Sequence, residues 1–439
     1  MPVLEKYQNK RVAVYGMGLT GLSAAKKLKL LKAEVFCWDD SRKVRKKINK
    51  LKFKLNKFWL KRDQNGIDFI VLSPGIDINK CKLKNYLKKN FKKIITDLDL
   101  FFELNNKSLV ISITGTNGKS TTCKIIEKIL RTAGYNANAA GNIGKPILSL
   151  RKSRKKRIFI LEISSYQLQY SKIFRSKYTA ILNITPDHLE RHQNIRNYIL
   201  TKSKIFYGQK KGDCAYINKT DKYARYIKTI HKNKKLKSKL ILINKKNCNL
   251  LLKKSSNKYF KSEGYVKNLA FAYNIVKKFK IRDKIILRAL NKFKGLPHRQ
   301  EIVFSNKKLV CINDSKATSF DACSQSLSNY DRIYWIVGGL PKYGDRFNLR
   351  GKAKKIVKAY IIGKSTSFFS KQIAKKIPYA ISKNLKNAIR NIDYDVKKNK
   401  YSKNTILFSP AAASFDQFNN FEDRGNFFKN LAIKKFKRT

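Results

Sequence analysis

The residues best suited to chemistry stand in one short segment, 114–122, which reads TGTNGKSTT. This segment follows the apolar, strand-like run 109–113 and precedes a stretch with helical spacing at 124–130. A glycine-rich turn between a strand and a helix points its backbone N–H groups at phosphates, and the N-terminus of the helix favours their negative charge. The segment therefore predicts a nucleoside-triphosphate site.

The lysine and the hydroxyl residues that follow it suit such a site. Lys119 would reach the β- and γ-phosphates, and Ser120 or Thr121 would hold Mg²⁺. A bare glycine turn before a helix is usually only a structural cap, but a lysine followed by two hydroxyl residues speaks against that interpretation. The common phosphate loop has Gly where this chain has Ile113, so the loop here is of a more compact type.

Two further strand-like runs, 158–161 and 179–183, are followed by polar residues. Glu162 ends the first run and could hold Mg²⁺ on nucleotide phosphates. The alternative is that the Ser-Ser pair behind it only caps a helix, and local sequence alone favours the cap. An Asp-His pair follows the second run, and His188 fits a metal ligand as well as a surface histidine. Ligands of open α/β sheets collect at the carboxyl ends of strands, so both places are candidate site positions.

The stretch 195–207 has the spacing of an amphipathic helix and contains Lys202 and Lys204. In so basic a chain, any single lysine is expected to be a solvated charge. The local pattern therefore singles out neither lysine.

Three polar turns follow strand-like runs in the last third of the chain. The first, NDSKAT at 313–318, groups an acid, a cation and two hydroxyls, which suits oxyanions and a ribose. The second, GGLPK at 338–342, places a cation just past a strand. The third, SPAAASFDQF at 409–418, has small residues leading to Ser414, so a carboxylate could approach backbone N–H groups there. Each could be ordinary turn chemistry, but three turns at strand ends of one domain favour a binding site.

The N-terminal segment 11–40 reads as strand, glycine turn, helix, strand and acid, which is typical of a Rossmann-like half. Its glycine turn reads GMGLTG at 16–21, and taken alone it could be no more than a tight connection between strand and helix. A third strand-like run, 68–72, leads into the turn SPGI at 73–76.

The alternation of strands and helices predicts an α/β protein of three domains. We expect a Rossmann-like N-terminal domain at 1–94, a central parallel-sheet P-loop ATPase domain at 95–297 and a C-terminal Rossmann-like α/β domain at 298–439. The lysine-rich stretch 214–262 looks irregular and carries no assignment.

The chain of 439 residues holds 99 Lys and Arg against 28 Asp and Glu, a net charge of +71. Such a balance is typical of nucleic-acid partners or anionic surfaces. The basic residues are spread over the whole chain, however, and no nucleic-acid-binding signature is present. We interpret the charge as a background that comes with the abundance of Lys, Ile, Asn, Phe and Tyr, as in an AT-rich genome.

Cysteine usage and the N-terminus point to the cytoplasm. The seven cysteines form no Cys-x-x-Cys pair, which argues against a zinc site or a disulfide framework. The first residues lack an apolar signal core, and no apolar run approaches membrane-spanning length. We expect a cytoplasmic protein without membrane insertion.

Together these motifs resemble the Mur ligases, and within them the branch that adds D-glutamate. The resemblance runs from Val12 to near the C-terminus, and its most discriminating marks are NDSKAT and SPAAASFDQF. The Asp-Asn-Pro-Arg motif of the branch that adds diaminopimelate or lysine is absent from the sequence. Folylpolyglutamate synthetases share the phosphate turn but have a different third domain.

The resemblance implies a reaction. ATP transfers its γ-phosphoryl group to the carboxylate of UDP-N-acetylmuramoyl-L-alanine, the amine of D-glutamate attacks the acyl phosphate, and phosphate leaves. Two Mg²⁺ ions would support the transfer, which needs mainly positioning and charge neutralisation. We also expect a monomer that has no nucleic-acid partner and does not insert into a membrane.

The resemblance assigns roles residue by residue. For ATP it implies Gly115, Thr116, Asn117, Gly118, Lys119, Ser120, Thr121, Asn268, Arg299, Asp314 and Lys316. For the UDP-sugar it implies Leu19, Thr20, Asp39, Ser73 and Asn142, and for D-glutamate Thr318, Lys342, Ser414 and Phe415. The catalytic residues would be Lys119, Glu162, His188 and Lys202, and the metal ligands Ser120, Glu162, His188 and Lys202, the last as a carbamate.

One departure and three alternatives accompany the resemblance. The family has His-Asn a few residues before Asn268, whereas this chain has Gly264 and Tyr265, so one nucleotide contact is expected to be lost or replaced. The alternatives are a sibling ligase with another amino acid, a basic ATP-dependent nucleic-acid-binding protein, and a non-catalytic regulator with the same fold. Further helicase motifs are absent from the sequence, and the lysine, hydroxyl and acid set is intact.

Overall fold

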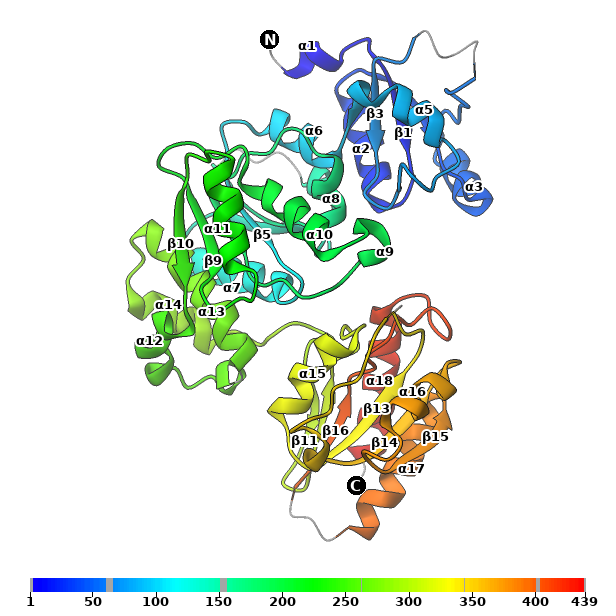
Figure 1. The fold of residues 1–439 in the computed structure, drawn as a ribbon, viewed down its shortest axis with the longest axis vertical. Helices are drawn as coiled ribbons and strands as arrows, with labels where there is room; N and C mark the ends of the chain where they lie inside the picture. Colours follow the sequence, from blue (N-terminus) through cyan, green and yellow to red (C-terminus); the bar gives the residue numbers. More distant parts are fainter. Residues whose placement is uncertain are drawn as a thin grey trace. The chain divides into compact units, whose positions relative to one another are not determined.

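A computed structural model describes residues 3–60, 66–150, 156–261, 263–342, 344–399 and 403–437. The chain divides into two compact units, Met1–Phe293 and Lys294–Thr439, which are described separately below (Figure 1).

The first unit begins with a four-stranded parallel sheet in the order β2-β1-β3-β4. Its strands are β1 (Arg11–Tyr15), β2 (Glu34–Trp38), β3 (Phe69–Leu72) and β4 (Ile94–Ile95). The helices around it are α1 (Val3–Tyr7), α2 (Leu19–Leu30), α3 (Arg42–Lys50), α5 (Lys84–Lys89) and the 3₁₀ turn η1 (Phe91–Lys93). The strands are short apolar runs, as expected for a parallel sheet with both faces covered.

The same unit contains a six-stranded parallel sheet in the order β10-β9-β8-β5-β7-β6. Its strands are β5 (Leu109–Thr114), β6 (Ala137–Gly141), β7 (Ile158–Glu162), β8 (Tyr178–Ile181), β9 (Cys214–Asn218) and β10 (Lys239–Ile243). The helices are α6 (Asp97–Leu104), α7 (Lys119–Thr132), α8 (Ser165–Tyr170), α9 (Leu189–His192), α10 (Ile195–Ser203), α11 (Ala224–Asn233), α12 (Asn249–Lys254), α13 (Glu263–Val276) and α14 (Asp283–Asn291). Short 3₁₀ turns are η2 (Ile147–Ser149), η3 (Lys204–Phe206), η4 (Lys245–Cys248), η5 (Lys258–Lys261) and η6 (Lys277–Phe279).

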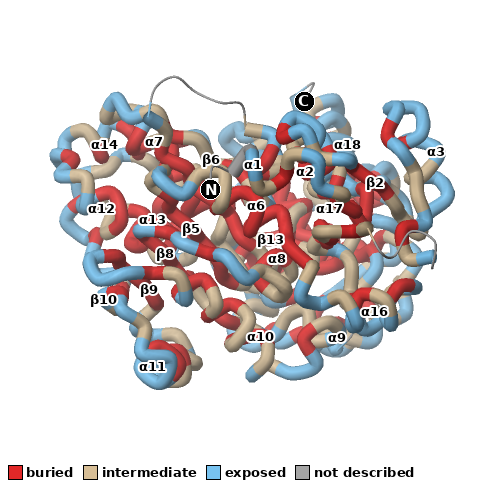
Figure 2. The backbone as a smooth tube through the Cα atoms, turned by 90° about the horizontal axis from the view of Figure 1, so that it is seen from above, coloured by how far each residue is buried: buried red, intermediate tan, exposed pale blue. Residues whose placement is uncertain are grey.

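Helices cover both faces of this central sheet. Successive side chains of β5 point to opposite faces, so Ile111 and Ile113 join the core under α7, α13 and α14, while Val110 joins the core that α6 and α10 complete. Strands β5 and β8 are buried along most of their length (Figure 2). The polar residues that follow these parallel strands therefore meet at one edge of a rigid sheet.

The second unit holds a six-stranded sheet in the order β11-β12-β16-β13-β14-β15, in which only the edge pair β11 and β12 is antiparallel. Its strands are β11 (Glu301–Ser305), β12 (Leu309–Asn313), β13 (Ile333–Gly338), β14 (Ile356–Ile362), β15 (Tyr379–Lys383) and β16 (Asn404–Phe408). Helices α15 (Phe320–Asn329) and α16 (Thr366–Ile373) pack on one face, and α17 (Leu385–Lys398) and α18 (Phe421–Phe436) on the other. The turn η7 (Ala353–Lys355) precedes β14.

The expected α/β class with three sheet-containing parts is confirmed. The domain limits at 94/95 and 297/298 stay predictions. The stretch 214–262, which the sequence leaves unassigned, contains two strands and two helices of the central sheet layer, β9 to α12. In the described residues, no helix is both long and apolar enough to cross a membrane, and the seven cysteines are free thiols.

Candidate active site

The phosphate turn lies between β5 and α7, where the sequence places it. Gly118 has a φ of +83°, and a Cβ there would lie 2.2 Å from Oδ1 of Asn268. Glycine is therefore required on two counts, the left-handed backbone and the close approach of the amide. The same contact places Asn268 of α13, a predicted nucleotide residue, directly beside the turn.

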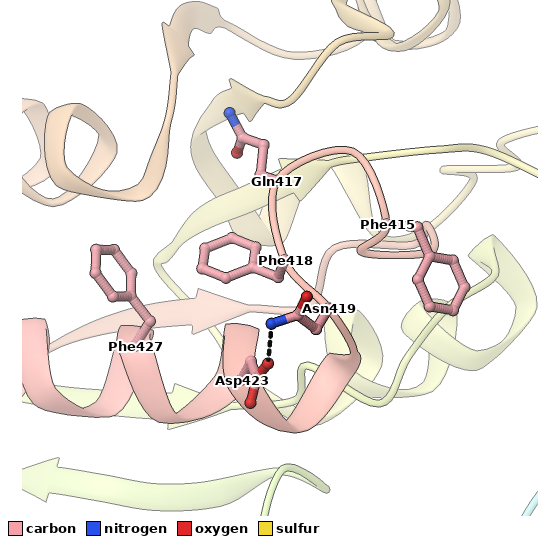
Figure 3. A pocket seen from close by; sticks show the side chains of 6 residues that line it. All are labelled: Phe415, Gln417, Phe418, Asn419, Asp423 and Phe427. Carbon is pink, nitrogen blue, oxygen red and sulfur yellow. Dashed lines mark hydrogen bonds between the residues drawn. The ribbon is translucent and has the colours of Figure 1, made fainter. Parts of the chain in front are cut away.

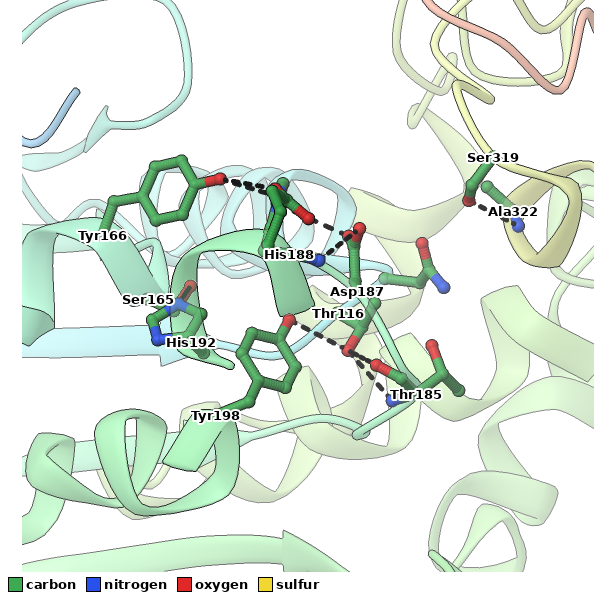
Figure 4. A network of polar contacts seen from close by, with 12 residues as sticks. Thr116, Ser165, Tyr166, Thr185, Asp187, His188, His192, Tyr198, Ser319 and Ala322 are labelled. Atoms are coloured by element: carbon green, nitrogen blue, oxygen red, sulfur yellow. Dashed lines mark hydrogen bonds and ion pairs between the residues drawn. The ribbon is translucent and has the colours of Figure 1, made fainter. Parts of the chain in front are cut away.

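Residues after β8 brace the turn from the neighbouring strand end. Asn183 accepts a hydrogen bond from the Asn117 N–H at 2.8 Å and donates one to the Asn117 carbonyl at 3.0 Å. The Thr116 hydroxyl lies 3.2 Å from both the Thr185 carbonyl and the Tyr198 hydroxyl (Figure 4). Because hydrogen bonds hold both Thr116 and Asn117, the turn has a fixed shape without a bound phosphate.

Two lysine amines meet at this turn. Nζ of Lys119 donates to the carbonyls of Gly115 and Thr116 at 2.9 and 2.8 Å. Nζ of Lys202 donates to the same Gly115 carbonyl at 2.9 Å, and the residue is only 2% exposed. Burial first, and the nearby Lys119 charge second, hold the pKa of Lys202 well below its ordinary value.

The interpretation of every lysine as a solvated charge is therefore wrong at two positions. Lys202 is buried beside the phosphate turn. Lys204 is partly buried, donates to the Gln169 carbonyl at 2.7 Å, and has its pKa lowered by burial. The sequence pattern could not reveal either case, because nothing next to Lys202 at the end of α10 or to Lys204 at the start of η3 distinguishes them from other lysines.

Glu162 stands at the carboxyl end of β7, next to β5, and connects two predicted site residues. Its Oε2 accepts the Ser120 hydroxyl at 2.5 Å, and its Oε1 accepts the Asn142 side-chain amide at 3.1 Å. The cap interpretation also holds, since Ser164 forms a capping box with Gln167 at the start of α8. The Ser-Ser pair thus starts the helix while Glu162 faces the first turn of α7.

The Asp187-His188 pair lies past β8, immediately before α9. His188 has a left-handed backbone, with a φ of 56° and a ψ of 31°, which is uncommon for a residue with a side chain. Its Nδ1 lies 3.0 Å from the Tyr166 hydroxyl, and its Nε2 lies 3.5 Å from Oδ2 of Asp187 (Figure 4). A strained backbone that is fixed by neighbouring side chains is typical of a functional position.

The predicted site offers few oxygen and nitrogen atoms as ligands for a metal ion. In the described parts of the chain, no group of three or more His, Cys, Asp or Glu side chains is arranged to hold a metal ion. A Mg²⁺ ion keeps several waters and is bound through one or two carboxylates and the phosphates of a nucleotide. The Ser120 hydroxyl and the Glu162 carboxylate, 2.5 Å apart, fit such a site.

The predicted UDP-sugar residues of the first sheet lie at the carboxyl ends of β1, β2 and β3. Ser73 donates its hydroxyl to the Gly16 carbonyl at 2.5 Å, which ties the two turns together. The Asp39 carboxylate accepts the Met17 and Ser41 N–H groups at 2.7 and 2.8 Å, so it fixes the glycine turn.

The remaining two residues of this group begin α2, and their placement suits a ligand that lies along the turn. Leu19 is 73% exposed, and Thr20 follows it in the first turn of the helix. Asn142, the fifth residue, comes from the central sheet and donates to Glu162. The structure therefore places it beside the phosphate turn.

In the second unit, the three polar turns share one sheet edge, because β12, β16 and β13 are parallel neighbours. Leu340 and Ala413 exchange two backbone hydrogen bonds, which joins the turn of Lys342 to that of Ser414. Arg424 of α18, only 1% exposed, donates to the carbonyls of Ser315 and Ala412 at 2.9 Å each. All predicted D-glutamate residues thus stand on turns that are tied to one another.

Asp314 is buried inside this edge. Its carboxylate accepts the hydroxyls of Ser326 and Ser409 at 2.5 and 2.8 Å and the Gln300 N–H at 3.2 Å. Burial raises the pKa of Asp314 to about 6. The geometry therefore gives Asp314 a role in holding the NDSKAT turn.

Other predicted residues of this unit lie nearer the surface. Nζ of Lys316 lies 3.6 Å from the ring centre of Phe421, and Arg299 and Thr318 are partly exposed. Phe415 is 71% exposed and lines, with Phe418 and neighbours, a shallow pocket of about 480 Å³ (Figure 3).

The sequence analysis did not identify the residues that hold the predicted site residues in place. Asn183 and Tyr198 brace the phosphate turn, Tyr166 contacts His188, and Arg424 ties the C-terminal turns. Only Arg424 left a signal, as a lone cation inside the otherwise apolar face of α18. The others stand in ordinary polar positions whose partners are far away in the sequence.

The chain is similar to several known proteins. The model of the Mur ligase middle domain matches residues 113–283. A UDP-N-acetylmuramoylalanine–D-glutamate ligase of Rickettsia felis is 34% identical over 98% of this chain and 98% of the relative. A protein of the same name from Rickettsia bellii is 35% identical over 97% of this chain and 98% of the relative.

Solved structures share the fold at low sequence identity. A UDP-N-acetylmuramate–alanine ligase of Thermotoga maritima matches with a TM-score of 0.54 at 15% identity, over 98% of this chain and 99% of that one. A pseudomurein peptide ligase of type C from Methanothermus fervidus matches with a TM-score of 0.53 at 18% identity, over 97% and 100%. From the nearly full-length relatives above 30% identity, it follows that this chain belongs to the Mur ligase family.

Proposed function

We propose that this chain is an ATP-dependent amide ligase that adds D-glutamate to UDP-N-acetylmuramoyl-L-alanine in cytoplasmic peptidoglycan precursor synthesis. The observation that carries the proposal is the group at the end of β5, in which Lys119, buried Lys202 and the Ser120–Glu162 pair surround one glycine turn. The nearly full-length relatives named for this reaction support the choice of substrates. The enzyme acts as a monomer and without nucleic acid.

The turn 115–121 binds the phosphates of ATP. Lys119 neutralises charge on the transferring γ-phosphoryl group, and Asn268 contacts the nucleotide next to Gly118. Arg299 and Lys316 of the second unit are also assigned to the nucleotide, and Asp314 is assigned to it through the turn that it holds. Tyr265, which stands where relatives of the family have a polar pair, is buried at the start of α13.

Two Mg²⁺ ions would support the transfer. Ser120 and Glu162 would hold the first on the nucleotide, and His188 and Lys202 would hold the second. A neutral lysine amine adds carbon dioxide with release of a proton, and the resulting carbamate is an anion that ligates Mg²⁺. Burial of Lys202 and its lowered pKa favour the neutral amine that this reaction needs. When bound, such ions would neutralise phosphate charge.

The substrates define the bond changes. A carboxylate oxygen of the L-alanyl group attacks the γ-phosphorus, and ADP leaves. The amine of D-glutamate then attacks the acyl carbon, loses a proton, and phosphate leaves with that oxygen. Leu19, Thr20, Asp39, Ser73 and Asn142 bind or shape the UDP-sugar site, and Thr318, Lys342, Ser414 and Phe415 bind D-glutamate.

Phosphate release with a panel of amino acids tests the proposal. With ATP and UDP-N-acetylmuramoyl-L-alanine present, D-glutamate should support turnover, and D-alanine should be a very poor acceptor. A site built for a carboxylate rejects an analogue without it, because its polar groups are left unpaired. Efficient use of L-alanine or diaminopimelate would assign the chain to a sibling ligase.

Lys342→Ala is the matching variant. It should raise the KM for D-glutamate much more than the KM for ATP, because Lys342 offers the compact cation of the amino-acid pocket. Equal effects on both KM values would remove Lys342 from that pocket.

A further inference from the structure

One short segment of the chain, residues 185–191, connects the phosphate turn with the first sheet. At its start, the Thr185 N–H donates to the Thr116 hydroxyl of the phosphate turn at 3.0 Å. At its end, Arg191 of α9 reaches the turn 73–76, which follows β3 of the first sheet. The segment therefore joins the places assigned to ATP and to the UDP-sugar.

The Arg191 guanidinium is nearly enclosed, and its donors are divided between the turn and α8. The side chain is 7% exposed. Nη2 donates to the Ile76 carbonyl at 2.6 Å and, over a longer 3.5 Å, to the Pro74 carbonyl. Nε donates to Oε1 of Gln169 at 2.6 Å. Because a planar guanidinium presents its donors at fixed angles, these bonds fix the turn relative to the helix.

Two rings and a carboxylate hold the guanidinium in place. Its central carbon lies 5.1 and 5.6 Å from the ring centres of Tyr166 and Tyr170, both on α8. Oδ2 of Asp77, whose side chain is 14% exposed, lies 3.9 Å from Nε of Arg191. Loss of this cation would leave enclosed acceptors unpaired, which costs more than the loss of a surface charge.

The position of the turn 73–76 also determines that of the glycine turn after β1. The Ile76 N–H donates to the Ser73 carbonyl at 3.0 Å, and the Ser73 hydroxyl donates to the Gly16 carbonyl. A Cβ at Gly16 would lie 2.9 Å from Cγ1 of Ile76, so Ile76 packs directly against the glycine turn. A shift of Ile76 would therefore move both turns of the UDP-sugar site.

We propose that Arg191 is a positioning residue that holds the turns of the UDP-sugar site in a fixed place relative to the phosphate turn. The acceptor carboxylate must be aligned with the γ-phosphorus, and a misplacement of ~1 Å can cost ~10²-fold in rate. The inference rests on the proposed function for the identity of the two ligands. The connection itself can be observed in protein without ligands.

The first test is amide hydrogen exchange of the ligand-free protein, measured by mass spectrometry. Arg191→Met keeps a long side chain but removes the donors, so the segment 76–81 should exchange faster than in the parent. The reporters are the N–H groups of Ile76, Ile78 and Cys81, which form hydrogen bonds within or next to the turn. The buried strand β5 should exchange as in the parent. Unchanged exchange at 76–81, or faster exchange in β5 as well, would overturn the proposal.

The second test separates the two substrates. In Arg191→Met, kcat/KM for UDP-N-acetylmuramoyl-L-alanine should fall by ~10²-fold. The affinity for a nonhydrolysable ATP analogue, measured by calorimetry without the UDP-sugar, should be that of the parent. An arginine with a merely structural role would affect both ligands or neither. Equal losses for both, or a normal kcat/KM for the UDP-sugar, would contradict the positioning role.

Arg196→Met is the matched control. Arg196 lies on α10, the next helix, is exposed, and donates to the Tyr226 hydroxyl at 3.1 Å. This substitution removes the same charge away from the turn 73–76, so hydrogen exchange and kinetics should be those of the parent. A loss as large as that in Arg191→Met would mean that charge alone matters, and the proposal would fail.

Arg191→Lys keeps the charge and serves if Arg191→Met does not fold. A lysine ammonium lacks the planar fork that holds Gln169 and Ile76 together, so kcat/KM for the UDP-sugar should still fall. Parent-like kinetics and hydrogen exchange in Arg191→Lys would overturn the proposal. If the parent does not use the UDP-sugar while exchange at 76–81 responds to these variants, the proposed function fails and the connection through Arg191 stands.

Discussion

At the scale of single residues, two lysines of the site share one hydrogen-bond acceptor. Both Lys119 and Lys202 donate to the Gly115 carbonyl. Two ammonium groups on one oxygen repel each other, and the repulsion grows as water is excluded. Lys119 faces the phosphate turn, whereas Lys202 is buried with a lowered pKa. The less costly arrangement is one charged lysine and one neutral or modified one, which agrees with the two roles proposed for them.

Lys119→Ala tests the charged lysine. We expect turnover to fall by at least ~10²-fold, the scale of removing a preorganised electrostatic group. Lys128→Ala, on the same helix but away from the turn, should stay close to the parent. The measurement is phosphate release at saturating substrates, and near-normal release by Lys119→Ala would refute the nucleotide assignment.

Lys202→Ala tests the modified lysine. In the proposed site this variant lacks the carbamate ligand of the second Mg²⁺, so it should be nearly inactive and partly rescued by short-chain carboxylates. Arg196→Ala removes an exposed cation from the same helix and should behave like the parent. Similar activity losses in both variants, or no rescue, would argue against a carbamate at Lys202.

Site residues differ in how far the sequence alone reveals them. Lys119 and Ser120 stand in a motif whose spacing has a physical reason, so they could be predicted directly. Lys202 came only from the family resemblance, because nothing in its neighbourhood distinguishes it from other lysines. Tyr166 and Asn183 could not be predicted, since their contacts are made with residues 22 and 66 positions away.

At the scale of elements, the C-terminal turns depend on buried polar anchors. Asp314 joins β12 to α15 and to the residue after β16 through its two serine partners. An acid in this position is stable either as an ion that accepts three hydrogen bonds or as a neutral group. The raised pKa of Asp314 shows that burial outweighs the hydrogen bonds.

The sign of the resulting pH dependence follows from that raised pKa. The folded pKa of about 6 exceeds the unfolded 3.8, so the protonated acid stabilises the fold fully below about pH 4, and this contribution is lost as the pH rises through 6. The difference corresponds to about 3 kcal/mol at most in the free energy of unfolding.

Asp314→Asn removes this titration. Trp335 is buried in the core of the second unit and serves as the fluorescent probe in a Trp38→Phe, Trp59→Phe background. The stability of the Asp314 protein relative to Asp314→Asn should fall between pH 4 and 6. A constant or rising difference over this range would contradict the assignment.

The sequence predicted most inner strands and the edge strand β2, but it missed the inner strand β9 and the edge strands β10 and β15. β5, β7 and β13 are apolar runs buried on both faces, and the sequence marks them clearly. β10 and β15 lie at the ends of their sheets, and both contain lysine and partly exposed residues. In β15 a serine and a lysine interrupt the apolar pattern, whereas the apolar run 240–243 of β10 stands in a lysine-rich stretch that hides it.

At the scale of the whole molecule, the net charge of +71 raises the question of nucleic acid. A dedicated binder would bind tightly, with log K falling by about 0.9 per phosphate contact as log salt rises. We expect only weak, non-specific binding to duplex and single strands at physiological salt. Submicromolar binding together with RNA-stimulated ATP hydrolysis would overturn the ligase assignment.

The most direct test of the central claim follows the oxygen atoms of the acceptor carboxylate. UDP-N-acetylmuramoyl-L-alanine with heavy oxygen in its alanyl carboxylate is incubated with ATP and D-glutamate, and mass spectrometry is applied to the phosphate and the nucleotide product. The account predicts one heavy oxygen in each released phosphate. The UDP-linked product should be heavier by one D-glutamate residue and should keep the second heavy oxygen. Unlabelled phosphate, or a nucleotide product without D-glutamate, would contradict it.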